Sequence, residues 1–146
     1  MVKPDIKGRF ASSMLRFVAA VKNEAEICAD ICGGFNDKEL QILLFVGEKD
    51  SVKMSDIADN IKSPVSTLTT IIDKLVEKQY LARVHSDEDR RVVNVTLLAK
   101  GKTAYRTVLR RKEEMTEKVL RSFTPTEQRA FIDYLDKMSA VIETVG

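Results

Sequence analysis

The feature that most constrains the fold is a helical pattern followed directly by the pattern of a β-hairpin. Apolar residues over 65–76 recur at about 100° per residue, which predicts a helix with one buried face. Two β-rich runs follow at residues 81–85 and 92–97, and every residue of the 86–91 connection is polar. This connection contains no Asn-Gly or Asp-Gly pair, so we expect a long projecting loop instead of a tight turn.

Two helices are predicted in the N-terminal part of the chain. Apolar residues spaced by threes and fours over 10–31 mark one stripe of a long helix, which Gly33-Gly34 should end. Asn36 and Glu39 have the spacing of a capping box, which predicts a second helix that runs to about residue 47.

Serine residues are expected to begin the next two helices. Ser55 can cap a short helix that ends near Ile61. Ser63 is expected to cap the helix that precedes the hairpin, with Pro64 at its first helical position.

Two long amphipathic helices are expected after the hairpin, over 99–122 and from Thr124-Pro125 onward. The side chains of the last helix expected to face inward are Phe131, Tyr134, Leu135, Met138, Val141, Ile142 and Val145. The element order is therefore ααααββαα, a mainly α fold with a small β-hairpin wing (α+β).

The exposed face of the predicted helix over 63–79 is small and hydroxylic. Its outward residues are Ser66, Thr67 and Thr70 and, further along, Asp73, Lys74 and Glu77, with Thr69 on the flank. Short side chains permit close approach to the major groove of DNA, where hydroxyls can bond base edges or phosphates. Two short helices followed by a polar-tipped hairpin form a winged helix-turn-helix, which favours binding of double-stranded DNA. The alternative is an ordinary helix surface built from residues of mediocre helix propensity.

The terminal helices predict a homodimer. Their apolar stripes exceed what the small central unit can cover, and a second copy of the chain can bury them. Two recognition helices would then lie roughly 34–36 Å apart and require a pseudo-palindromic site. Within one compact domain we expect an N-terminal dimerisation helix at 1–35, a winged DNA-binding region at 36–98 and C-terminal dimerisation helices at 99–146.

Composition excludes many enzymes. One histidine, His85, and two cysteines leave little material for metal sites or His-based catalysis, so no metal, cofactor or catalytic residue is expected. His85 itself is expected to be structural or to contact the DNA backbone. The net charge of +2 is too weak for indiscriminate binding to polyanions, although basic residues concentrate over 101–122. The chain shows neither a signal peptide nor a membrane-spanning run, so we expect a cytoplasmic protein that does not engage a membrane.

Cys28 and Cys32 lie one helical turn apart, and Cys28 falls on the apolar stripe of the first helix. Two buried thiols are the simplest interpretation. A redox switch is the alternative, but it needs a lowered thiol pKa, and the nearby charges of Glu24, Glu26 and Asp30 act in the opposite direction.

The run from Asp89 to Gly101 resembles the wing signature of MarR-type regulators, D-x-R-x-x-x-V-x-L-T-x-x-G. It matches every fixed position except Leu98, where the signature has threonine. The resemblance extends to Leu68-Thr69, Asp73-Lys74-Leu75 and Arg83, and the order of helices is similar over nearly the whole chain.

Two further positions depart from the family pattern. Thr70 stands where an arginine is common in the recognition helix, and Gln79 replaces the usual glycine after it. Neither change removes the winged fold.

The resemblance implies a transcriptional regulator, usually a repressor. In this family the dimer releases DNA when a small aromatic or phenolic ligand binds between the helical and winged parts, or when a cysteine is oxidised. By position, Asp89 would hold Arg91 with a charge-assisted bond, so that Arg90 or Arg91 enters a minor groove narrowed at A·T pairs.

The other candidate contacts lie on the helix-turn-helix. Ser55 and Ser63 would donate to phosphates beside free backbone N–H groups. The full set of candidate DNA-binding residues is Ser55, Ser63, Ser66, Thr67, Thr69, Thr70, Lys74, Arg83, Arg90 and Arg91. For the wing arginines the alternative is a loop that is polar simply because it is exposed.

Other functions remain open from the sequence. A winged domain used only for protein–protein assembly is favoured by the net charge of only +1 over residues 51–100. A cysteine redox-sensing regulator is the second alternative. A thiol enzyme would need a base beside Cys28 or Cys32, and the sequence places none there.

Overall fold

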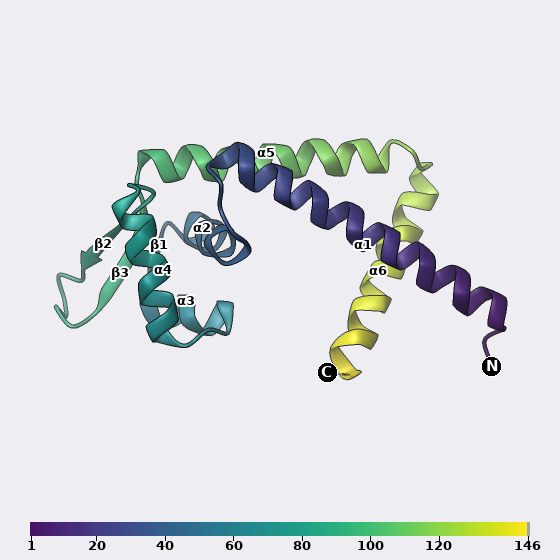
Figure 1. The fold of residues 1–146 in the computed structure, drawn as a ribbon, viewed down its shortest axis with the longest axis horizontal. Coiled ribbons are helices and arrows are strands. Elements are labelled where there is room, and N and C mark those ends of the chain that lie inside the picture. The colour runs from purple at the N-terminus through teal and green to yellow at the C-terminus, as the bar shows by residue number, and fades with distance from the viewer. Residues whose placement is uncertain (146) are drawn as a thin grey trace. The chain divides into compact units, whose positions relative to one another are not determined.

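The computed structural model describes residues 1–145 and divides into two compact units, Met1–Val108 and the remainder from Leu109 (Figure 1). The elements are α1 (Pro4–Cys32), α2 (Asp37–Lys49), β1 (Ser51–Lys53), α3 (Met54–Ile61), α4 (Val65–Glu77), β2 (Leu81–His85), β3 (Val93–Leu97), α5 (Ala99–Leu120) and α6 (Pro125–Val145). The predicted mainly α fold with a hairpin is confirmed. None of the described helices is both long enough and apolar enough to cross a membrane.

The hairpin belongs to a three-stranded antiparallel sheet in the order β1-β3-β2. Sequence analysis missed β1, a three-residue strand in which Val52 pairs with Val95 and both side chains are buried. A strand this short has one inward residue and cannot show a period-two pattern. The strand matters because it fixes the start of α3 against the sheet that carries the wing.

Both serine caps were predicted wrongly. Lys53 and Pro64 are the N-cap residues of α3 and α4, and neither helix has a side-chain cap. Lys53 keeps the extended backbone of β1, so Ser55 falls inside the first turn of α3. Pro64 has ψ of 143°, which places it before the helix, so Ser63 lies one position too early to cap it.

The capping box predicted at Asn36 is confirmed, and a second one begins the last helix at Thr124. Asn36 accepts a hydrogen bond from the Glu39 N–H through its side chain, and Glu39 accepts one from the Asn36 N–H, both at 2.9 Å. Thr124 and Glu127 make the equivalent pair at the start of α6. These ends depend only on residues three apart in the chain, which is why the local sequence predicts them.

The first unit is built around the inner face of α4. Leu68, Ile72 and Leu75 are fully buried there, as the helical period predicts. Val65 was expected on the same face but is 56% exposed, because it is the first residue of the helix and lies beyond the edge of the core.

The end of α4 is a Schellman motif. The Tyr80 N–H donates to the Leu75 carbonyl and the Gln79 N–H to the Val76 carbonyl, each at 2.9 Å. Gln79 has φ of 63°, in the left-handed region, which explains why a glycine is usual at this position in the family pattern. The motif turns the chain directly from α4 into β2.

Tyr80, the residue after that turn, is buried where three segments meet. Its ring makes an edge-to-face contact with Phe35, with ring centroids 4.7 Å apart, and its carbonyl accepts a hydrogen bond from the Leu98 N–H at 3.0 Å. A Cβ at Gly33 would overlap the Tyr80 hydroxyl, and a Cβ at Gly101 would overlap the Tyr80 carbonyl oxygen. The end of α1 and the start of α5 therefore both pack on one side chain and its peptide.

The second unit comprises the end of α5 and all of α6. Phe123 and Phe131 stack with ring centroids 5.3 Å apart, and the Gln128 amide donates to the carbonyls of Leu120 and Phe123. No described residue of α6 is buried, although Phe131, Leu135 and Met138 are half-buried. The inward placement predicted for the other four apolar residues is wrong for a single chain. These four are Tyr134, Val141, Ile142 and Val145, and all of them are exposed.

The stripe of α1 is exposed in the same way. Phe10, Phe17 and Val18 are each about half exposed, and only Ala29 and Cys32 of this helix are buried. A single chain therefore leaves apolar faces of two helices in water, which monomeric proteins seldom do.

We predict that Gly101→Ala destabilises the protein by about 1–3 kcal/mol, because the new methyl group meets a backbone oxygen that cannot rotate away. Gly8→Ala is the matched control, since nothing lies within 4 Å of that position in α1. The control should be neutral or stabilising by up to about 1 kcal/mol. Urea unfolding followed by circular dichroism measures both, and equal stabilities would show that the α5–Tyr80 packing is not as close as described.

Candidate nucleic-acid interface

The outer face of α4 presents hydroxyl oxygens as acceptors. Ser66, Thr67 and Thr70 are exposed, and Thr69 is half-buried at the flank. The Thr69 hydroxyl donates to the Val65 carbonyl at 2.8 Å, and the Thr70 hydroxyl donates to the Ser66 carbonyl at 3.3 Å. Because their protons are used within the helix, both oxygens can accept from the amino groups of adenine or cytosine.

Lys74 is tied to the neighbouring helix. Its ammonium nitrogen lies 2.6 Å from Oε1 of Glu39, whose side chain is almost fully buried, while the other Glu39 oxygen caps α2. The capping pattern in the sequence predicts that Glu39 caps α2, but it does not predict the ion pair with Lys74. The structure therefore places Lys74 in a link between α2 and α4, with half of its side chain still exposed.

This environment lowers the pKa of Glu39. Burial acts to raise the pKa, but the hydrogen bond from Lys74, the backbone N–H of Asn36 and the charges of Lys74 and Lys78 together outweigh it. Glu39 is thus held ionised between α2 and the recognition helix α4.

Arg83 of β2 is also paired. Its guanidinium forms an ion pair and hydrogen bond with Asp73 on the outer side of α4. The sequence contains both residues but gives no sign that they meet. The pair fixes the first strand of the wing to the recognition helix, and it partly neutralises the charge predicted to face DNA.

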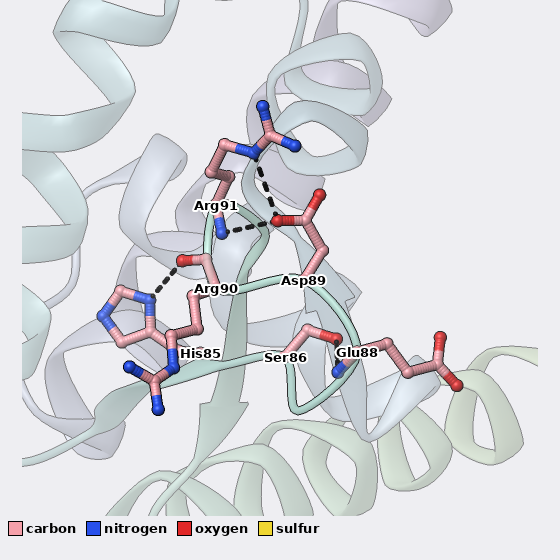
Figure 2. Close-up of polar contacts among 6 residues, drawn as sticks. All are labelled: His85, Ser86, Glu88, Asp89, Arg90 and Arg91. Atoms are coloured by element: carbon pink, nitrogen blue, oxygen red, sulfur yellow. Dashed lines mark hydrogen bonds and ion pairs between the residues drawn. The ribbon is translucent and has the colours of Figure 1, made fainter.

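The wing contains the predicted contact between Asp89 and Arg91 (Figure 2). One carboxylate oxygen, Oδ1 of Asp89, accepts from the Arg91 backbone N–H at 2.9 Å and from its Nε at 3.3 Å. The Arg91 side chain is 93% exposed, so its two terminal nitrogens remain available to a partner. The arrangement orients a charged group at the tip of a projecting loop.

Arg90 lies on the same loop, and its guanidinium is directed away from that of Arg91 (Figure 2). Nδ1 of His85 is 3.1 Å from the Arg90 carbonyl oxygen, and the Ser86 hydroxyl accepts from the Glu88 N–H at 3.3 Å. These contacts within the loop give it a defined shape. Adjacent arginines therefore point in different directions, and the wing presents two separate cations.

The two serines predicted at helix starts differ in exposure. Ser55 is exposed in the first turn of α3. Ser63 is 8% exposed, and its hydroxyl accepts a hydrogen bond from Lys38 Nζ at 3.0 Å. This low exposure and the hydrogen bond from Lys38 count against the predicted role of Ser63 as a phosphate donor.

The cysteines lie on one face of α1, as their spacing predicts. Their Sγ atoms are 3.9 Å apart, far longer than a disulfide bond of about 2.05 Å. Cys28 is half-buried and Cys32 is buried, which agrees with the interpretation of two thiols packed at the end of the helix.

Comparisons with known proteins agree with this geometry. The model of the MarR family matches residues 35–93. In Bacillus subtilis, the uncharacterized HTH-type transcriptional regulator YfiV is 28% identical over 72% of this chain and 66% of its own length. The HTH-type transcriptional repressor MdtR of the same organism is 27% identical over 76% of this chain and 72% of its own.

Solved structures share the fold. Streptococcus pneumoniae FabT, in complex with DNA, has a TM-score of 0.79 at 22% identity, covering 93% of this chain and 99% of its own. NadR, in complex with 4-hydroxyphenylacetate, has a TM-score of 0.67 at 17% identity, and the match covers 86% of this chain and 89% of the NadR chain.

The fold, with α4 and the wing facing outward, is that of a winged helix-turn-helix protein. Over residues 35–93 the chain resembles the MarR family, and the relatives that match it over about three quarters of its length are named HTH-type transcriptional regulators, which agrees with a DNA-binding regulator.

We predict that the free energy of unfolding falls as the pH drops below about 4.5, and that Glu39→Gln makes this fall shallower. Because the folded pKa of Glu39 is below its unfolded value, its contribution is complete above that unfolded value and is lost as the pH falls through the folded one. Glu77→Gln, on the exposed side of α4, is the matched control and should follow the wild type. Urea unfolding at a series of pH values measures this, and equal slopes for Glu39→Gln and the wild type would contradict the ion pair.

Proposed function

We propose that the protein is a homodimeric repressor that binds a pseudo-palindromic operator in the cytoplasm and is released by a small aromatic ligand. The observation that carries the proposal is Arg91, held by Asp89 at the tip of a projecting wing beside a hydroxylic recognition helix. A charge held in a fixed direction is suited to enter a DNA groove, whereas a loop that only contacts solvent does not need an oriented charge.

Each half of the dimer would read DNA in two ways. The first two turns of α4 enter the major groove, where Ser66, Thr67 and Thr70 contact base edges and Thr69 lies at the flank. Arg91, with Arg90 on the same loop, enters the adjacent minor groove, whose negative potential is greatest at A·T tracts. Ser55 contacts a phosphate from the start of α3.

Lys74 and Arg83 would act differently from the wing arginines. Each already has an acidic partner, Glu39 and Asp73 respectively. We therefore assign them to the phosphate backbone, as secondary contacts made from positions that also hold α4 in place. This leaves base discrimination to the neutral hydroxyls of α4.

The dimer is supported by the exposed apolar stripes of α1 and α6. Phe10 and Phe17 of α1 and Val141 and Ile142 of α6 are each about half exposed or more. Burying such faces against a second copy removes apolar area from water, which is the main favourable term in association.

A ligand-responsive repressor also needs a pocket. Between the end of α1 and the start of α5 lies a pocket that is open to solvent and has a volume of about 310 Å³, at the lower end of the volumes typical of small-molecule sites. Its lining residues are Ile31, Cys32, Tyr80, Lys100, Thr103, Ala104 and Thr107. We propose it as the effector site, by analogy with the complex of NadR and 4-hydroxyphenylacetate.

We predict that Arg91→Ala weakens operator binding by about 1–3 kcal/mol and lowers the salt dependence of the affinity. Asp89→Ala should also weaken binding, although it removes a negative charge, because it frees the arginine from its orientation. Arg110→Ala on α5 is the charge-matched control and should bind as the wild type does. Fluorescence anisotropy with a genomic fragment selected by the protein measures all three, and unchanged affinity in Arg91→Ala would count against the wing.

We predict that the protein sediments at twice its chain mass of 16.5 kDa. Phe17→Glu, on the apolar stripe of α1, should shift it to the monomer, because it places a charge in the buried interface. Lys22→Glu, on the same helix but polar in the wild type, should remain dimeric. Analytical ultracentrifugation gives the masses, and a monomeric wild type at micromolar concentration would exclude the proposed dimer.

A further inference from the structure

The cysteine pair at the end of α1 takes no part in the DNA binding proposed above. Cys28 and Cys32 lie one turn apart on the same face of the helix, with their Sγ atoms 3.9 Å apart. Cys32 belongs to the hydrophobic core, and the half-buried Cys28 packs against that core. Two sulfur atoms are therefore held side by side at the edge of the core of the first unit.

The helix holds the two cysteines too far apart for an unstrained disulfide. Side chains four residues apart on an α-helix have Cβ atoms about 5–6 Å apart, whereas a disulfide needs a separation of about 3.5–4.5 Å. Regular helix continues through both residues and ends at Cys32, so a direct S–S bond would distort the backbone of α1. The spacing suits a bridge that places one further atom between the sulfurs.

A metal ion bound by both sulfurs is such a bridge. With metal–thiolate bonds of about 2.3 Å, two sulfurs on one ion can lie up to about 4.6 Å apart. The distance of 3.9 Å between the Sγ atoms of Cys28 and Cys32 is within this limit. The helix therefore already brings both sulfurs within reach of a single ion.

The number of donors decides which ion the pair can hold. Among residues 1–145, no group of three or more His, Cys, Asp or Glu side chains is placed to hold a metal ion. Zinc takes four ligands in structural sites, and calcium and magnesium take six or more, mainly oxygen, so two thiols complete none of these sites. Thiolates select soft ions such as Cu(I), and two of them are sufficient for this ion.

The surroundings of the pair also favour a bound cation. The last turn of α1 contains Asp30 and no basic residue, and the helix dipole adds partial negative charge at this end. These charges oppose the formation of a free thiolate, but they attract a metal ion, which itself deprotonates the thiols that coordinate it. Cys32 also lines the pocket that is open to solvent, which gives an ion a path to its sulfur.

We propose that Cys28 and Cys32 form a site for one soft, two-coordinate metal ion, with Cu(I) as the probe. When the ion binds, two S–Cu bonds form and both thiols release their protons to solvent, with no change in oxidation state. Two thiolates and one monovalent cation leave one net negative charge on the complex. The inference does not depend on the proposed function, because the site uses none of the residues assigned to DNA.

The first experiment measures Cu(I) uptake by the full-length protein without oxygen, in a reductant that contains no thiol. Cu(I) is supplied as its coloured complex with bicinchoninate, and loss of the colour reports transfer to the protein. The wild type should take up one Cu(I) per chain. Cys28→Ser should bind Cu(I) at least about 100-fold more weakly, because even groups outside the coordination shell contribute up to about 100-fold to metal affinity.

Two further variants complete this experiment. Cys32→Ala removes the second sulfur without placing a polar group in the core, and it should lose Cu(I) to the same extent as Cys28→Ser. Asp30→Asn, which lies between the two cysteines and removes a carboxylate, is the matched control and should bind Cu(I) as the wild type does. Circular dichroism of each variant checks that α1 and the rest of the chain remain folded.

The second experiment identifies the donor atoms by X-ray absorption at the copper edge. The loaded wild type should show two sulfur neighbours and no nitrogen or oxygen neighbour. The proposal is overturned if the wild type leaves Cu(I) on bicinchoninate, if one ion is bound per two chains, or if copper has nitrogen or oxygen neighbours. Unchanged affinity in Cys28→Ser, or an equal loss in Asp30→Asn, would contradict it as well.

Discussion

The burial of Tyr80 is the constraint on which the first unit depends. Its ring packs edge to face on Phe35, its N–H completes the end of α4 and its carbonyl takes the Leu98 N–H at the start of α5. Glycines are required on two sides, because a Cβ at Gly33 or Gly101 would overlap the tyrosine or its peptide. One residue therefore sets the positions of α1, α4 and the start of α5 relative to the wing, and any disturbance there reaches the recognition helix directly.

Electrostatics then decides which cations of the winged region are available to DNA. Lys74 and Arg83 are paired with acidic residues that hold α4 in place. Arg91 also has an acidic partner, but Asp89 engages only its backbone N–H and Nε, and the side chain remains almost fully exposed. A low net charge is thus compatible with DNA binding, because a few cations are directed outward while the rest stabilise the fold.

Local patterns predicted much of this structure. The capping boxes at Asn36 and Thr124 join residues three apart, and the sequence displays them directly. The contact from Asp89 to Arg91 was expected from the resemblance of the wing to a family signature. The serine caps at Ser55 and Ser63 failed because the preceding strand and Pro64 shifted the helix starts.

The contacts between distant segments escaped prediction. Glu39 with Lys74, Arg83 with Asp73 and Lys100 with Lys78 exist only once the tertiary fold brings the partners together. Strand β1 was missed because it is short and pairs with a distant strand.

Hydroxyl-radical footprinting of the protein on its selected operator is the most direct test of the two-fold DNA-binding account. The account predicts two sets of minor-groove protection related by two-fold symmetry about the centre of the site. A single protected segment with no symmetric counterpart would contradict it.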